Sequence, residues 1–240
     1  MIASFTQTYS NNRNILYHYH NKDSTDIYFR NKLDKNYYVF HNSPKNYTDC
    51  ICQGNYLSNI KNLSIISYND MSYTQTIFKT LQKCKEDGVK YLFFLQDDVF
   101  PLVDNNIIDE LLLFIKNNSF DMLNIEVPNI KLDAPIIYSS ENLKIYDTTS
   151  DDFKEKKIWS FDDGPYVASL DFLMTKIYDD IFFSKNDIWS AEIYLHDRVD
   201  KNKIERLSTN LSIFKRMAIV GPNACNVGEQ ITFLDDRFKC

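Results

Sequence analysis

The first half of the chain alternates between short apolar runs and segments in which apolar residues recur at helical spacing. Residues 2–9, 37–40, 62–67 and 91–96 contain apolar and β-branched or aromatic residues bounded by polar or turn-forming residues, so each predicts a strand. The run at 91–96 holds only apolar and aromatic residues before Gln96. This pattern is typical of a strand that is buried on both faces of a sheet.

Helical segments separate these strands. Ser72 and Gln75 match a capping box, and apolar residues then follow at helical spacing until Gly88. Asp104 is expected to cap a second helix, and a further strand is expected at 120–127. Such alternation favours an α/β fold, with a central, mostly parallel mixed sheet flanked by helices.

The second half of the chain is less regular. Residues 135–146 are consistent with a hairpin, 166–174 and 213–220 with strands, and 187–207 with a helix. We find no internal repeat, low-complexity linker or shift in composition that would mark a domain boundary. The sequence therefore predicts a single domain over 1–240.

Composition narrows the function classes. The formal net charge is −6 and no stripe of Lys and Arg stands out, which argues against a nucleic-acid-binding surface. No stretch is long and apolar enough to cross a bilayer. The first residues lack the basic start and apolar centre of a signal peptide. We therefore expect a cytoplasmic protein, and the sequence does not predict its oligomeric state.

The candidate chemistry begins where the apolar run at 91–96 ends. Gln96, Asp97 and Asp98 stand there, at the edge where open α/β sheets bind ligands. Carboxylates in this position need a partner, because an unpaired buried charge is costly. A divalent cation that also holds a diphosphate would be such a partner. The alternative is that both are solvated carboxylates in a strand-to-helix loop.

This strand end resembles the DxD motif of glycosyltransferases with the GT-A fold. The polar end of the first strand, the helix before the acidic strand end and a later acidic helix start resemble the same superfamily. The resemblance implies one GT-A-like (Rossmann-like) domain in which the last Asp of the motif holds Mn²⁺ or Mg²⁺ against a nucleotide sugar. Asp98 would then be the metal ligand, and Asp97 would support it or contact the ribose. Gln96 occupies the place of the first Asp, where this chain departs from the motif.

More narrowly, residues 3–8 and 95–98 are similar to the small viral GT-A domains of the chlorovirus type, which use a UDP-sugar and a divalent metal. This similarity implies hexosyl or deoxyhexosyl transfer to a glycan or another hydroxyl acceptor, in the host cytoplasm if the protein is viral. It also implies a nucleotide-binding half at about 1–127 and an acceptor half at about 128–240.

Several polar residues are candidates for contacts with the nucleotide. Hydroxyls and amides at the end of the first strand can read a uracil edge, and an Arg there can meet a phosphate. Two more candidates flank the start of the capped helix. For each of them, an ordinary polar loop or helix cap is the alternative. These candidates are Thr6, Gln7, Thr8, Arg13, Asp70 and Gln75.

On the acceptor side, residues 189–192 resemble the later acidic signature of the superfamily, in which a carboxylate faces the acceptor. Glu192 would deprotonate the incoming hydroxyl, and Asp163 is the second candidate for this base. The alternative is that Glu192 is an exposed helix acid. His20 is expected at the surface or in a loop.

Other classes are weaker matches. A sugar-phosphate nucleotidyltransferase would share the sheet, but it needs a glycine-rich loop after the first strand, and the first glycine here is Gly54. A P-loop enzyme is excluded for the same reason. A phosphatase with an aspartyl nucleophile would need a carboxylate where Gln96 stands. A non-catalytic protein that binds a nucleotide sugar or a glycan is the alternative from a different class.

Overall fold

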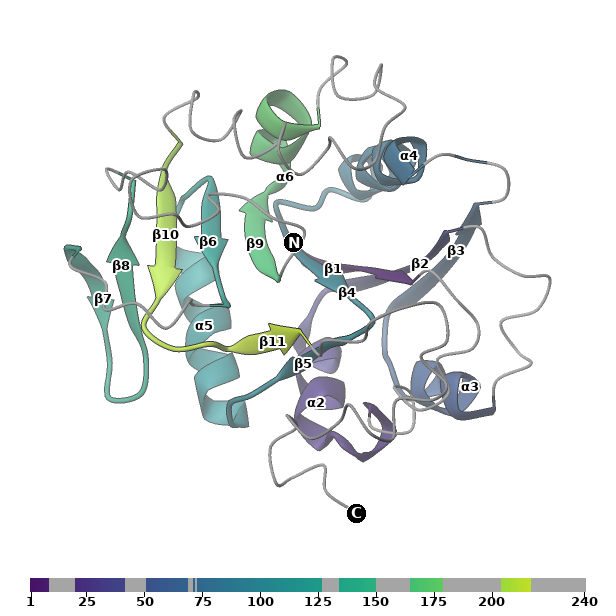
Figure 1. The fold of residues 1–240 in the computed structure, drawn as a ribbon, viewed down its shortest axis with the longest axis horizontal. Coiled ribbons are helices and arrows are strands. Elements are labelled where there is room, and N and C mark those ends of the chain that lie inside the picture. Colours follow the sequence, from purple (N-terminus) through teal and green to yellow (C-terminus); the bar gives the residue numbers. More distant parts are fainter. Residues whose placement is uncertain are drawn as a thin grey trace.

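A large mixed sheet with helices on both faces forms the body of the protein (Figure 1). The computed structural model describes residues 1–8, 20–41, 51–68, 71, 73–126, 134–149, 165–178 and 204–216. Nine strands form the sheet in the order β3-β2-β1-β4-β9-β6-β10-β8-β7. They are β1 (Ile2–Thr8), β2 (Lys35–His41), β3 (Leu63–Tyr68), β4 (Tyr91–Gln96), β6 (Met122–Asn124), β7 (Ile136–Ser139), β8 (Lys144–Asp147), β9 (Tyr166–Ser169) and β10 (Arg206–Thr209).

The strands run mostly in one direction. β1 pairs in parallel with β2 and β4, β2 pairs in parallel with β3, and β6 pairs in parallel with β10. Within this sheet β9 and β8 run against the others, since they pair antiparallel with β4, β6, β7 and β10. The predicted α/β fold with a mixed, mostly parallel sheet flanked by helices is therefore confirmed. No helix among the described residues is long and apolar enough to span a membrane.

Helices cover the two faces of the sheet separately. On one face lie α4 (Tyr73–Glu86), the short α6 (Leu170–Phe172) and the π-helix η2 (Leu173–Ile177). On the other face lie α2 (Ser24–Lys32), α3 (Ile51–Ser58) and α5 (Asn105–Asn117). Every residue of β1 and β4 is buried, because both strands lie between two helical layers.

Alternate side chains of β1 and β4 enter different cores. The rings of Phe5 and Phe94 contact edge to face on the side of the sheet that α4 covers, with centroids 4.7 Å apart. Phe93 faces the opposite way and packs against Phe29 of α2, with ring centroids 4.9 Å apart. Edge-to-face pairs of this kind add to the gain from burying apolar area. The two cores fix which face each strand residue occupies, and with it the direction of the polar residues at the strand ends.

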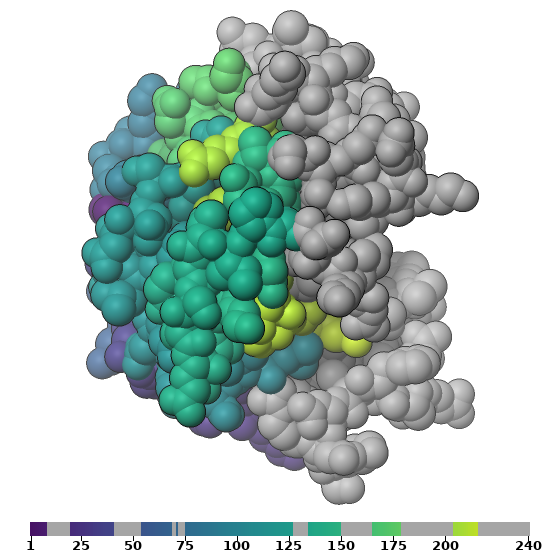
Figure 2. Space-filling model, turned by 90° about the vertical axis from the view of Figure 1, so that its left-hand side faces the viewer, coloured from purple at the N-terminus to yellow at the C-terminus, as the bar shows by residue number. Residues whose placement is uncertain are grey.

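A small second sheet reaches the end of β4. β5 (Val99–Pro101) follows Asp98 directly and pairs antiparallel with β11 (Phe214–Arg216). The register places Arg216 opposite Val99. In Figure 2 the residues of β10 and β11 lie against those of α5 and the β7–β8 hairpin. The last described segment is thereby brought to the acidic strand end.

Two predictions about the second half are wrong in part. The strand expected at 166–174 ends at Ser169, whose hydroxyl accepts a hydrogen bond from the amide of Phe172 at 3.2 Å and starts α6. The helix expected at 187–207 is replaced at its end by β10, and residues 187–203 lie outside the described ranges. Apolar runs this short carry no clear period, so pairing partners decided their conformation.

Candidate functional site

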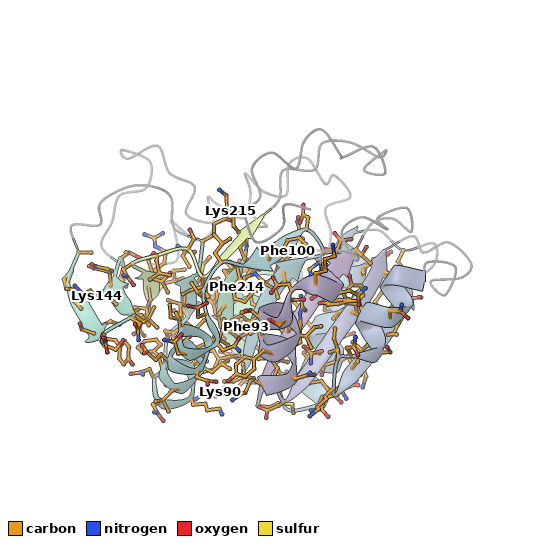
Figure 3. All side chains as sticks on the ribbon, turned by 90° about the horizontal axis from the view of Figure 1, so that it is seen from below. Lys90, Phe93, Phe100, Lys144, Phe214 and Lys215 are labelled. Carbon is orange, nitrogen blue, oxygen red and sulfur yellow. The ribbon has the colours of Figure 1, made fainter. Side chains whose placement is uncertain are left out.

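The carboxyl ends of β1 and β4 mark the place where an open α/β sheet binds ligands. β2 and β3 extend the sheet from β1 in one direction, and β4 extends it in the other, so the strand order reverses between β1 and β4. Ligands of such sheets bind in the crevice at this reversal. Figure 3 shows Phe100 and Lys215 at this end of the sheet and Lys90, which precedes β4, at the other end. Thr8 and Asp97 close the two strands here.

Asp97 is held at the end of β4 by β1. Its amide donates to the carbonyl of Gln7 at 3.1 Å, which continues the pairing of the two strands by one residue. The hydroxyl of Thr8 donates to Oδ2 of Asp97 at 2.5 Å. Asp97 is 1% exposed and Asp98 is 8% exposed. Two neighbouring carboxylates are therefore buried at the strand end, which is favourable only where other groups compensate their charge.

Two amide side chains lie on the α4 face of the same strand ends. Gln7 and Gln96 are register partners and continue the row that Phe5 and Phe94 occupy. Gln7 is 0% exposed, and neither Nε2 nor Oε1 has a hydrogen-bond partner in the part of the chain that the structure describes. Leaving a buried amide unpaired costs about 1–3 kcal/mol per group. Such a group at a ligand crevice is a candidate for pairing with a ligand.

A buried polar network lies on the other face of β1. Asp26 of α2 accepts from Nε of Arg30 at 3.2 Å and from the hydroxyl of Tyr56 at 2.5 Å. Arg30 in turn donates to the hydroxyl of Thr6. Burial alone would raise the pKa of Asp26, but the charge of Arg30 and the nearby His20 outweigh it and lower this pKa below its usual value. The network ties α2 to the strand that ends at Thr8.

The N-terminal cap of α2 predicts that the stability of the protein depends on pH. The carboxylate of Asp23 accepts from the amides of Thr25 at 2.9 Å and Asp26 at 3.2 Å. Burial, followed by the charge of Asp26, raises the pKa of Asp23 from 3.8 to about 6. Since the folded-state pKa is the higher one, the stabilisation is present below pH 4 or so and is lost as the pH rises through about 6.

Asp23→Asn is expected to remove this pH dependence, because an amide oxygen still caps the helix and carries no charge. The stability of the parent relative to the variant should fall by up to about 3 kcal/mol between about pH 4 and pH 7. Urea unfolding of both chains over this range measures the difference. A difference that does not change with pH would contradict the assignment.

The structure brings together most of the predicted nucleotide residues that it describes. The neighbouring ends of β1 and β4 carry Thr6, Gln7, Thr8, Gln96, Asp97 and Asp98. Gln75 lies in the first turn of α4 and is exposed. Four further candidates lie outside the described residues: Arg13, Asp70, Asp163 and Glu192. The role of every one of these residues in binding or catalysis stays a prediction.

Sequence reasoning missed two features of the site. His20 was expected at the surface or in a loop, and this is wrong: it is 1% exposed and lies against Asp97. Lys215 and Arg216 come to the acidic strand end only through the pairing of β11 with β5. No local pattern marks either feature, because both depend on contacts between residues far apart in the chain.

The carboxylates at the strand end fit a divalent cation that binds together with a phosphate-containing ligand. Within the described ranges no group of three or more His, Cys, Asp and Glu side chains is placed to hold a metal ion. Mg²⁺ is usually held by one or two protein carboxylates together with phosphate oxygens and water. Asp98 can supply such a carboxylate, while Asp97 already accepts from Thr8. The residues present therefore fit a cation shared with a diphosphate.

Comparison with known proteins gives a fold and no family. No family model matches the chain, and no curated protein matches it either. Among solved structures, S. aureus TarS 1-349 is 11% identical, with a TM-score of 0.50 over 88% of this chain. The chain spans 58% of that TarS fragment. This likeness supports the same GT-A-like arrangement of sheet and helices.

Two further solved structures match less well. A protein from Desulfovibrio desulfuricans G20, provisionally assigned as a nucleotide-diphospho-sugar transferase, is 10% identical with a TM-score of 0.44, over 86% of this chain and 78% of that one. A cytidylyltransferase from Leptospira borgpetersenii is 12% identical with a TM-score of 0.39, over 85% and 73% of the two chains.

Proposed function

We propose that this protein is a metal-dependent glycosyltransferase that moves a sugar from a nucleoside-diphosphate sugar, a UDP-sugar, to a hydroxyl of a glycan or similar acceptor. The observation that carries the proposal is the strand end itself. Asp97 and Asp98 are buried after the last residue of β4, and the buried amide of Gln7, near the end of the neighbouring β1, has no hydrogen-bond partner among the described residues. The strand order of the sheet reverses between these two strands, and a polar ligand bound there would pair with this amide.

The amides suit the base of the nucleotide. A glutamine side chain offers one N–H donor group beside one carbonyl acceptor, and uracil presents a matching acceptor and donor on one edge. Gln7 would read this edge, with Gln96 next to it. Thr8 holds the carboxylate of Asp97 in one orientation. Asp98, the next residue, would face the diphosphate. Arg13, outside the described residues, would contact a phosphate.

Asp98 would hold the Mn²⁺ or Mg²⁺ ion together with diphosphate oxygens and water. When bound, the ion supplies charge neutralisation to the departing diphosphate. On the acceptor side, Glu192 would take the proton of the acceptor hydroxyl, with Asp163 as the second candidate. The acceptor oxygen then forms a bond to the anomeric carbon, the bond from that carbon to the phosphate oxygen breaks, and UDP leaves.

The organisation of the chain is part of the same proposal. One domain would hold the nucleotide in the half at about 1–127 and the acceptor in the half at about 128–240. The similarity to small viral domains of the chlorovirus type and the transfer of a hexose or deoxyhexose also belong to the proposal. They rest on short sequence motifs at residues 3–8 and 95–98.

Gln7→Met is expected to stabilise the protein and weaken donor binding at the same time. Methionine has a similar volume and brings no unpaired polar atoms into the core, so the free energy of unfolding should rise by about 1–3 kcal/mol. Affinity for a UDP-sugar in the presence of Mn²⁺ should fall about tenfold, because two hydrogen bonds to the base are lost.

Calorimetric titration of UDP-, GDP- and dTDP-sugars, with and without Mn²⁺, measures the binding, and urea unfolding measures the stability. Gln82→Met is the matched control, because Gln82 is exposed on α4. The control should change neither quantity appreciably. Unchanged donor affinity in Gln7→Met, or the lack of any metal-dependent donor binding by the parent, would refute the proposed nucleotide site.

A further inference from the structure

His20 links the acidic strand end to helix α2. Its Nε2 lies 2.8 Å from the backbone oxygen of Asp97, and its Nδ1 lies 3.1 Å from Oδ2 of Asp26. The side chain is 1% exposed, just before the first turn of α2. A single imidazole thus bridges the end of β4 and the buried network that holds β1.

Both partners of the ring are acceptors. A backbone carbonyl has no hydrogen to donate, and Asp26 already accepts from Arg30 at 3.2 Å and from Tyr56 at 2.5 Å. Neutral imidazole carries one N–H and can serve only one of these acceptors. The bond to the carbonyl of Asp97 requires a hydrogen on Nε2, because a carbonyl can only accept. The imidazole thus lies between two acceptors, one of them a carboxylate.

Aromatic rings fix the plane of the imidazole. The ring of His20 stacks on Phe100 with centroids 4.0 Å apart and an interplanar angle of 18°. The ring of Tyr56 also lies against the imidazole, with centroids 4.7 Å apart and an interplanar angle of 32°. These two ring contacts hold the imidazole in the plane in which Nε2 meets the carbonyl of Asp97.

The contact with His20 is the third one that holds Asp97 in place. The amide of Asp97 donates to Gln7, its carboxylate accepts from Thr8, and its carbonyl accepts from His20. That carbonyl belongs to the peptide unit that joins Asp97 to Asp98. Its orientation therefore sets the direction in which the chain leaves β4 and presents the carboxylate of Asp98.

We propose that His20 is a positioning residue: held between Asp26 and the carbonyl of Asp97, it fixes the Asp97–Asp98 turn for donor binding. The part of this proposal that concerns the donor rests on the proposed function. The bridge between α2 and the turn stands on the contacts of His20 alone.

Two amide substitutions separate the two bonds of His20. The amide nitrogen of His20→Gln takes the place of Nε2 and can keep the bond to Asp97. The amide nitrogen of His20→Asn takes the place of Nδ1 and can keep only the bond to Asp26. Both variants lose the aromatic stacking, so a merely structural role would affect them alike. We expect His20→Asn to bind Mn²⁺ and UDP-sugar about 10–100-fold more weakly than His20→Gln does.

Two measurements on the whole chain test the bridge without any donor. Nitrogen-15 NMR of the chain labelled at its four histidines, with the signal of His20 identified by its loss in His20→Gln, should show a hydrogen on Nε2, which the bond to the carbonyl of Asp97 requires. Amide hydrogen exchange at Asp98 should be faster in His20→Asn than in His20→Gln. A ring without a hydrogen on Nε2, or equal exchange in the two variants, would overturn the bridge.

Equal donor affinity in the two variants would overturn the positioning role. If the parent chain binds no nucleotide sugar with Mn²⁺, the proposed function fails and the donor part of this inference fails with it. The nitrogen-15 spectrum and the exchange rates would still decide whether His20 holds the turn.

Discussion

Asp98→Ala is expected to abolish metal-dependent binding of the nucleotide sugar, with a loss in affinity of about 100-fold or more. Asp98 is the carboxylate at the strand end that we assign to the cation, and Asp97 beside it already accepts from Thr8. Asp98→Asn should also bind weakly, because an amide oxygen carries no net charge to offset that of the cation. Calorimetry with UDP and Mn²⁺ measures both variants.

The control for this prediction is Asp109→Ala. Asp109 is half exposed on α5, where it pairs with Lys32 at 3.1 Å, and it is not among the residues of the proposed site. An exposed pair of this kind contributes little to stability, so the control should bind the donor like the parent. Thermal unfolding of Asp98→Ala verifies that the variant is folded. Unchanged affinity for UDP with Mn²⁺ in a folded Asp98→Ala chain would refute the metal assignment.

Glu192→Gln is expected to reduce sugar transfer by about 10²–10⁴-fold while donor and metal binding stay nearly intact. The amide is close in shape to the carboxylate but cannot take the proton of the acceptor hydroxyl. In a retaining reaction the carboxylate would instead orient the acceptor or stabilise positive charge on the sugar. Turnover falls more than donor affinity in either case. Initial rates of UDP release with acceptor present, compared with calorimetric donor affinity, measure the two effects separately.

The products identify the class of protein when the outcome differs. Transfer at the parent rate in Glu192→Gln would make Glu192 an ordinary helix acid, and Asp163→Asn becomes the next variant to measure. Pyrophosphate release from a nucleoside triphosphate and a sugar phosphate would identify a nucleotidyltransferase. Donor binding without transfer to any acceptor, in the parent and in both variants, would identify a binding protein.

The strands and long helices of the first half could be predicted from the pattern of their apolar side chains. The run that became β4 is apolar in every position before Gln96, which is what burial on both faces requires. In α5 the apolar residues recur at helical spacing, and Ile108, Leu111 and Ile115 are buried as this spacing requires. The side chain of Asp104 makes no cap hydrogen bond, so the position of the helix start was predicted but its expected cap was not formed.

The second half was predicted less well because its elements are short. β9 and β10 have four residues each, too few for a period to distinguish a strand from a helix. β9 is a strand because β4 and β6 flank it on both sides. β10 is a strand because it pairs with β6 and β8. These partners lie far away in the sequence, and their pairing overrides weak local preference.

The residues of the candidate site also differ in whether the sequence or only the tertiary structure places them. The sequence by itself determined that polar residues end the two central strands, since an apolar run must stop where the sheet meets a crevice. It also determined that Asp97 and Asp98 lie at that edge. Only the tertiary structure decided which faces these residues occupy: the register of β1 with β4 places Gln7 beside Gln96 and Thr8 beside Asp97.

The tertiary structure alone also placed His20 against Asp97 at the end of β4, and Arg216 opposite Val99. The physical reason is the range of the interactions. Burial on two faces and helical spacing act between near neighbours and can be read along the chain. Hydrogen bonds from His20 to Asp97, or between β11 and β5, form only after the chain has folded back on itself, and no local preference encodes them.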